Sequence, residues 1–128
     1  MDNNNTMNIT LIQLGRIGDI LQTLNAISHP DKLDAKFSLI CRQSFGKPLI
    51  HLLEKYFDRI YFLDTDHLFQ NSQNLDQSIN KLDDFLNEIA QDEHHALINM
   101  TFSKPAAYLM SLIKSKVKVG ILLSNGLC

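Results

Sequence analysis

Several features are scarce in this 128-residue sequence, and each scarcity argues against a class of protein. No apolar run approaches the roughly 18 residues of a membrane-spanning helix. The polar N-terminus has neither the basic nor the apolar region of a signal peptide, so we expect a cytoplasmic location. A net charge of −2 argues against a general nucleic-acid binder. The two cysteines, Cys41 and Cys128, have no motif spacing, and we expect Cys41 to be a reduced, buried thiol.

The common ligand signatures are also missing. No G-K-S or G-K-T triplet exists for a Walker phosphate loop, and the glycine turn near the N-terminus reads G-x-x-G-D instead of the dinucleotide pattern G-x-G-x-x-G. The adjacent His94 and His95 lack the H-x-x-x-H or C-x-x-C spacing of metal ligands. His51 lies among apolar residues, which indicates a packed or surface histidine and not a catalytic one. We therefore expect no metal and no resident cofactor.

What the sequence does contain is an apolar content of 45% and a regular alternation of two patterns. Short β-favouring runs alternate with segments of helical periodicity, which predicts right-handed crossovers and a parallel sheet. The expected strands are residues 7–14, Phe37–Cys41, Arg59–Leu63, Ala96–Met100 and Val117–Ile121, and the expected helices cover about residues 18–28, 49–57, 75–92 and 103–113. The fold class predicted is α/β, a Rossmann-like parallel sheet with helices on both faces. We expect residues 1–7 to be a disordered N-terminus and residues 8–128 to form this domain.

In such sheets, ligands bind at the C-terminal ends of the strands. The segments expected there are Gly15–Asp19, Arg42 with Ser44, Asp64, and Asn99–Lys104. Asp19 falls in a first helical turn, where the helix dipole favours a carboxylate. Two interpretations stay open: Asp19 is a functional group, or it is an ordinary helix N-terminal charge beside turn-forming glycines. The acidic residues of the 75–92 helix and just beyond it are expected to solvate its outer face; they are Asp76, Asp83, Asp84, Glu88, Asp92 and Glu93.

The stretch Leu14–Ile27 resembles the N-terminal domain of the heptosyltransferases, glycosyltransferase family nine, which act in lipopolysaccharide core assembly. Three further segments follow in the family's order and at about its spacing: Ile60–Asp64, Ala96–Lys104 and Val119–Gly120. The resemblance runs from residue 8 to about residue 121.

The resemblance implies an inverting, metal-independent transfer of heptose from a nucleotide-sugar donor. It implies a GT-B enzyme, in which the N-terminal Rossmann-like domain holds the lipopolysaccharide core or lipid A acceptor and the C-terminal domain holds ADP-heptose. The family's base corresponds to Asp19. By the same resemblance the acceptor-binding residues would be Gly15, Arg16, Gly18, Ser103 and Lys104.

The chain departs from the family in length, so we expect a truncated acceptor-side domain without the donor domain. Alone, it is expected not to transfer sugar. A non-catalytic Rossmann-like binding module is the alternative, and an unrelated nucleotide-binding domain is disfavoured by the absent cofactor signatures. The resemblance also leaves open a peripheral contact with the inner face of the inner membrane. Lys114, Lys116 and Lys118 would serve such a contact, or would simply complement a helix dipole.

Overall fold

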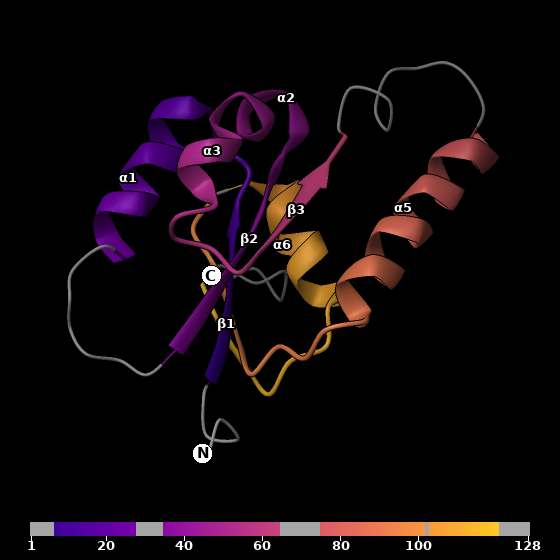
Figure 1. Ribbon diagram of the computed structural model, residues 1–128. Helices are drawn as coiled ribbons and strands as arrows, with labels where there is room; N and C mark the ends of the chain where they lie inside the picture. The colour runs from indigo at the N-terminus through magenta and orange to yellow at the C-terminus, as the bar shows by residue number, and fades with distance from the viewer. Residues whose placement is uncertain (1–6, 28–34, 65–74, 102, 121–128) are drawn as a thin grey trace.

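A five-stranded, all-parallel sheet forms the centre of the computed structural model, which describes residues 7–27, 35–64, 75–101 and 103–120 (Figure 1). The strand order is β3-β2-β1-β4-β5. Their bounds are Met7–Gln13 for β1, Ala35–Arg42 for β2, Arg59–Leu63 for β3, Ala96–Asn99 for β4 and Val117–Val119 for β5. The predicted parallel α/β sheet is confirmed. Strand β1 begins at Met7, as the predicted strand does, whereas the predicted domain boundary wrongly placed residue 7 in the disordered N-terminus; residues 1–6 lie outside the described part.

The helices agree with prediction except in one segment. The first helix, α1, spans Ile17–Ile27, α5 spans Leu75–Ala90, and α6 spans Lys104–Leu112. The expected helix over 49–57 is confirmed as α-helix only for Ile50–Leu53. The chain instead becomes helical directly after β2, in three short pieces: α2 (Gln43–Gly46), η2 (Lys47–Leu49) and α3 (Ile50–Leu53). Pro48 lies in the middle piece and, because proline lacks an N–H, favours this break in the α-helical hydrogen bonding.

Helices cover both faces of the sheet, as predicted, because strand residues alternate between two cores. Helices α1, α2 and α3 lie on one side in Figure 1, and α5 and α6 lie on the other. The core on the α1 side contains Leu11, Ile20, Leu24, Leu39, Cys41, Leu53 and Phe57. The core on the α5 side has more buried residues and includes Ile12, Ile40, Tyr61, Phe85, Ile89, Leu97, Leu109 and Met110.

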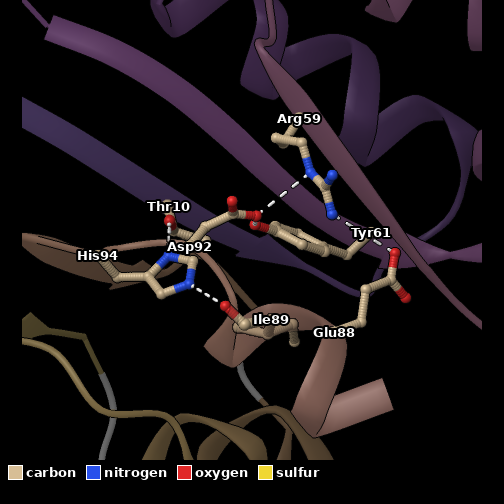
Figure 2. Close-up of polar contacts among 7 residues, drawn as sticks. All are labelled: Thr10, Arg59, Tyr61, Glu88, Ile89, Asp92 and His94. Carbon is tan, nitrogen blue, oxygen red and sulfur yellow. Dashed lines mark hydrogen bonds and ion pairs between the residues drawn. The ribbon is translucent and has the colours of Figure 1, made fainter. Parts of the chain in front are cut away.

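A polar cluster joins the end of α5 to β3 (Figure 2). The Tyr61 hydroxyl donates to Asp92 Oδ2 at 2.5 Å. The Arg59 guanidinium lies 3.3 Å from Asp92 and 3.6 Å from Glu88, and it stacks 4.9 Å from the centroid of the Tyr61 ring. Glu88 is exposed, as expected of an acid on the outer face of α5, and its ion pair with Arg59 lies at the surface. The expectation that these acids only solvate an outer face is wrong for Asp92, just beyond α5, which bonds to Tyr61 and pairs with Arg59 of β3.

The sheet changes direction at β1, and this positions the candidate site. From β1 the chain moves outward through β2 to β3, then crosses back to β4 on the other side of β1 and continues to β5. The connections after β1 and after β4 therefore diverge at the C-terminal ends of two neighbouring strands. Such a switch point leaves a crevice, which is where ligands bind in open α/β sheets.

Candidate functional site

A cavity of about 450 Å³ lies at this switch point. The residues that line it come from the end of β1, the turn into α1, the first turns of α1, and the segment after β4. They are Gln13, Gly15, Asp19, Gln22, Thr23, Met100 and Thr101. The cavity therefore occupies the position that the topology predicts for a ligand.

The Gly15 turn places the Asp19 carboxylate over the end of β1. A Cβ atom at Gly15 would clash with the Asp19 side chain, so a glycine is required for this approach. Asp19 Oδ2 accepts a hydrogen bond from the Arg16 backbone N–H at 3.1 Å, which caps the start of α1. Asp19 is nevertheless exposed, and no described residue bonds to its other carboxylate oxygen. One oxygen of the carboxylate is positioned and the other is available.

The floor of the cavity is the buried side chain of Gln13, which is 6% exposed. Its Oε1 accepts from the Gly15 backbone N–H at 2.9 Å and from the Thr101 hydroxyl at 3.1 Å. Its Nε2 donates to Thr23 Oγ1 at 3.1 Å. One amide thus connects the turn, helix α1 and the segment after β4, which fixes the three elements that form the cavity.

The threonine hydroxyls of the cavity are already occupied. Thr23 donates to the Asp19 carbonyl at 3.0 Å, and Thr101 accepts from the Leu14 backbone N–H at 2.7 Å. The exposed polar side chains that line the cavity are those of Asp19 and Gln22. They are three residues apart on α1 and therefore share a face. A ligand would meet a carboxylate, a carboxamide and the Met100 thioether, which is 37% exposed.

The structure brings together only part of the predicted acceptor-binding set. Gly15 and Asp19 line the cavity, whereas Arg16 and Gly18 are exposed beside it and do not line it. Ser103 accepts from the Ala106 backbone N–H at 3.3 Å, which confirms its predicted role as the cap of α6. Lys104 is exposed at the first position of α6, outside the cavity lining.

Sequence reasoning missed Gln13, Gln22 and Thr23 as members of the site. Gln13 and Thr23 carried a readable signal, because each is a polar residue at a position whose neighbours are apolar and core-facing. The segment Asn99–Lys104, which contains Met100 and Thr101, was predicted to reach this end of the sheet and does so. Arg42, also predicted there, lies with its guanidinium 4.9 Å from the Phe45 ring centroid and does not line the cavity.

The two adjacent histidines serve the fold. Both ring nitrogens of His94 are bonded, Nδ1 to the Thr10 hydroxyl and Nε2 to the Ile89 carbonyl oxygen, each at 2.7 Å (Figure 2). His95 Nδ1 accepts from the Asn8 backbone N–H at 3.0 Å. Within the described residues, no group of three or more His, Cys, Asp or Glu side chains could hold a metal ion. None of the helices in these ranges is long and apolar enough to cross a membrane.

Comparison of the chain with protein-family models, curated proteins and solved structures finds no match. The class that the fold defines is a Rossmann-like α/β domain with a polar cavity at its switch point.

Proposed function

We propose that this chain is the acceptor-side domain of a sugar-transfer enzyme of the heptosyltransferase type, with Asp19 as the general base. The observation that carries the proposal is the position of Asp19. Its carboxylate lines the switch-point cavity, with one oxygen held by the Arg16 N–H and the other exposed. A general base needs this combination of a fixed orientation and a free acceptor atom.

The chemistry follows from that free oxygen. An acceptor hydroxyl bonded to Asp19 gives its proton to the carboxylate as the hydroxyl oxygen attacks the anomeric carbon of the donor sugar. The bond from that carbon to the nucleoside diphosphate breaks on the opposite face, so the configuration inverts and the diphosphate leaves with the bonding electron pair. In a GT-B arrangement, a second Rossmann-like domain would hold the ADP-heptose donor.

The remaining cavity groups suit a polyhydroxyl ligand. The Gln22 amide can donate to one sugar hydroxyl and accept from another, and Met100 offers an apolar surface to the sugar C–H groups. Among the described residues, no Lys or Arg side chain lines the cavity. In the proposal, Arg16 and Lys104 would therefore meet acidic groups of a lipopolysaccharide core only outside it, at the cytoplasmic face of the inner membrane.

The test is calorimetric titration of the 128-residue chain with deacylated lipopolysaccharide core oligosaccharide. Asp19→Asn keeps an oxygen that can accept from the Arg16 N–H, but it removes the charge. We expect binding to weaken roughly tenfold, because a hydrogen bond to a charged group contributes about 1.5–3 kcal/mol. The matched control is Asp83→Asn, an exposed carboxylate on α5, which should not change the affinity. Absence of saturable binding by the unaltered chain would refute the proposal.

One contact favours the alternative, a non-catalytic binding module. The bond from the Arg16 N–H to Asp19 is a normal helix cap, and it accounts for a carboxylate at this position without any chemistry. The same titration separates the two functions. If the oligosaccharide binds with equal affinity to the unaltered chain and to Asp19→Asn, the proposed bond between Asp19 and an acceptor hydroxyl is not formed, and the non-catalytic binding module is favoured.

A further inference from the structure

A second cavity, of about 380 Å³, lies at the opposite end of the sheet. Its walls are the C-terminal parts of α5 and α6 and the two loops that lead into β4 and β5. Apolar side chains supply much of the lining, including Leu86, Ile89, Leu112 and Ile113. The volume is within the range of about 300–1,000 Å³ typical of small-ligand sites, and within the described part of the chain the cavity shares no lining residue with the Asp19 site.

The polar groups of His94 and Asp92, which line one wall, are already bonded within the protein, and Figure 2 shows these bonds. His94 is bonded through both ring nitrogens, to Thr10 and to the Ile89 carbonyl oxygen. The Asp92 carboxylate accepts from Tyr61 and lies 3.3 Å from Arg59. These contacts hold the wall in place, and they leave little for a polar ligand to gain inside the cavity.

Two lysines that have no ion-pair partner among the described residues bring positive charge to the cavity. Of the two acids in the lining, Asp92 is paired with Arg59, whereas Glu93 is exposed and lies 3.3 Å from His95 Nε2, a contact that is ionic only when the imidazole is protonated. The two lysines of the lining, Lys114 and Lys116, are exposed, and neither has an ion-pair partner within the described ranges. An anionic group at the rim would therefore gain two ammonium contacts, whereas a cationic group would be repelled.

We propose that this cavity binds a single-chain amphiphile with an anionic head, such as an alkyl carboxylate. Its chain would lie against Leu86, Ile89 and Ile113, and its carboxylate would bond to Lys114 and Lys116. Burial of the alkyl chain supplies most of the affinity, at about 25 cal/mol per Å² of apolar surface, and the lysines select the charge of the head. This inference does not depend on the proposed function of Asp19, because no residue is common to the two sites.

The test uses monomeric decanoate as the probe, with calorimetry on the full chain. We expect saturable binding of decanoate and no binding of decyltrimethylammonium, which has a similar chain and the opposite charge. Lys114→Gln combined with Lys116→Gln should weaken decanoate binding roughly tenfold. Lys36→Gln combined with Lys55→Gln, two exposed lysines elsewhere, is the matched control.

A second variant tests the cavity itself. Ala90 is an exposed residue of the lining, so Ala90→Phe can project a ring across the cavity without entering the core, and decanoate binding should be lost. Ala26→Phe, on the exposed face of α1, controls for the added ring. Equal binding of decanoate and decyltrimethylammonium, or decanoate binding that survives both sets of cavity variants, would overturn the proposal. So would adsorption to phosphatidylglycerol vesicles without any binding of monomeric decanoate, since that result needs only surface lysines.

Discussion

At both ends of the sheet, buried polar side chains are hydrogen-bonded within the protein. The two ends differ in the side chains that line their cavities. At the C-terminal end, Gln13, Thr23 and Thr101 bond to one another or to backbone. At the N-terminal end, His94 bonds to the Thr10 hydroxyl and the Ile89 carbonyl oxygen, and Asp92 accepts from Tyr61. What differs is the set of side chains at each cavity: a carboxylate and an amide at one end, and alkyl groups with two ammonium groups beside the exposed Glu93 at the other.

This contrast teaches that internal polar networks and ligand-facing groups are separate components of each site. The network determines where the backbone lies, and the side chains that it leaves unbonded determine what could bind there. The cavities also differ in origin. The C-terminal one follows from the strand order, because the connections diverge at β1, whereas the N-terminal one depends on how the ends of α5 and α6 are packed. Substitutions can therefore break one end while leaving the other intact.

The largest effect is expected for Gln13→Ala. The variant removes three hydrogen bonds. The Gly15 N–H and the Thr101 hydroxyl lose the amide oxygen that they donate to, and Thr23 loses the bond from the amide nitrogen. Because Gln13 is buried, we expect the free energy of unfolding to fall by about 3 kcal/mol, measured by urea denaturation. Gln22→Ala is the matched control. It removes an exposed glutamine of the same cavity and should change stability by less than about 0.5 kcal/mol.

If Gln13→Ala and Gln22→Ala destabilise the chain equally, the Gln13 network does not hold this end together. Decanoate binding offers an independent measurement. Because the second cavity lies at the far end of the sheet, its affinity for decanoate should be unchanged in Gln13→Ala. This affinity is measured without denaturant, at a temperature at which the variant is folded.

The next effect is a loss of stability at alkaline pH, and its first step is assigned to Cys41. Burial raises the pKa of Cys41, which pairs in register with Gln13, from about 9 to about 12. Between these values the unfolded chain loses the thiol proton while the folded chain keeps it. Stability from this group is therefore fully present below pH 9 and falls above it by up to about 1.4 kcal/mol per pH unit. Urea denaturation at pH 8, 9 and 10 under reducing conditions measures the slope.

Tyr61 adds a second alkaline step that reports on the N-terminal network. Its pKa is raised by burial, then by the hydrogen bond to Asp92 and the Asp92 charge, against an opposing contribution from Arg59. The neutral phenol is thus favoured in the folded state, so this contribution declines only above about pH 10. Cys41→Ala should flatten the slope between pH 9 and pH 10, and Tyr61→Phe should leave that interval nearly unchanged. A slope that both variants preserve would contradict the assignment.

Much of the fold was predictable because hydrophobic periodicity reports directly on burial. The run Arg59–Leu63 matches β3 residue for residue, and the apolar spacing after Leu75 identified α5. The prediction failed in part for the helix over 49–57, where a proline changes the hydrogen bonding that the apolar spacing alone would predict. Leu49, Ile50 and Leu53 have helical spacing, but Pro48 interrupts the hydrogen bonding before them. The chain was predicted to become helical several residues later than it does.

The site was predictable only in outline. Gly15 and Asp19 were found because a glycine turn before a helix has a local signature, which needs no knowledge of the rest of the chain. The bonds of Gln13 to Thr101 and of Tyr61 to Asp92 join residues far apart in sequence, and a single sequence carries no signal for such pairs. The predicted acceptor role of Lys104 stays a prediction, since it depends on a ligand that reaches beyond the cavity.

The smallest expected effect is a change in stability that has opposite signs for alanine substitutions at Gly18 and at Gly15. No atom lies within 4 Å of a Cβ built at Gly18, which is in the first turn of α1, so Gly18→Ala should stabilise the chain by about 0.5–1 kcal/mol through helix propensity. Gly15→Ala should do the opposite, because its Cβ displaces the Asp19 carboxylate from the Arg16 N–H. Paired urea denaturation and oligosaccharide titration measure both properties. If Gly18→Ala is stabilising yet weakens oligosaccharide binding, Gly18 is kept as glycine for close approach of the acceptor. If binding is unchanged, the site at this end consists of the Gly15 turn and the α1 face that carries Asp19 and Gln22.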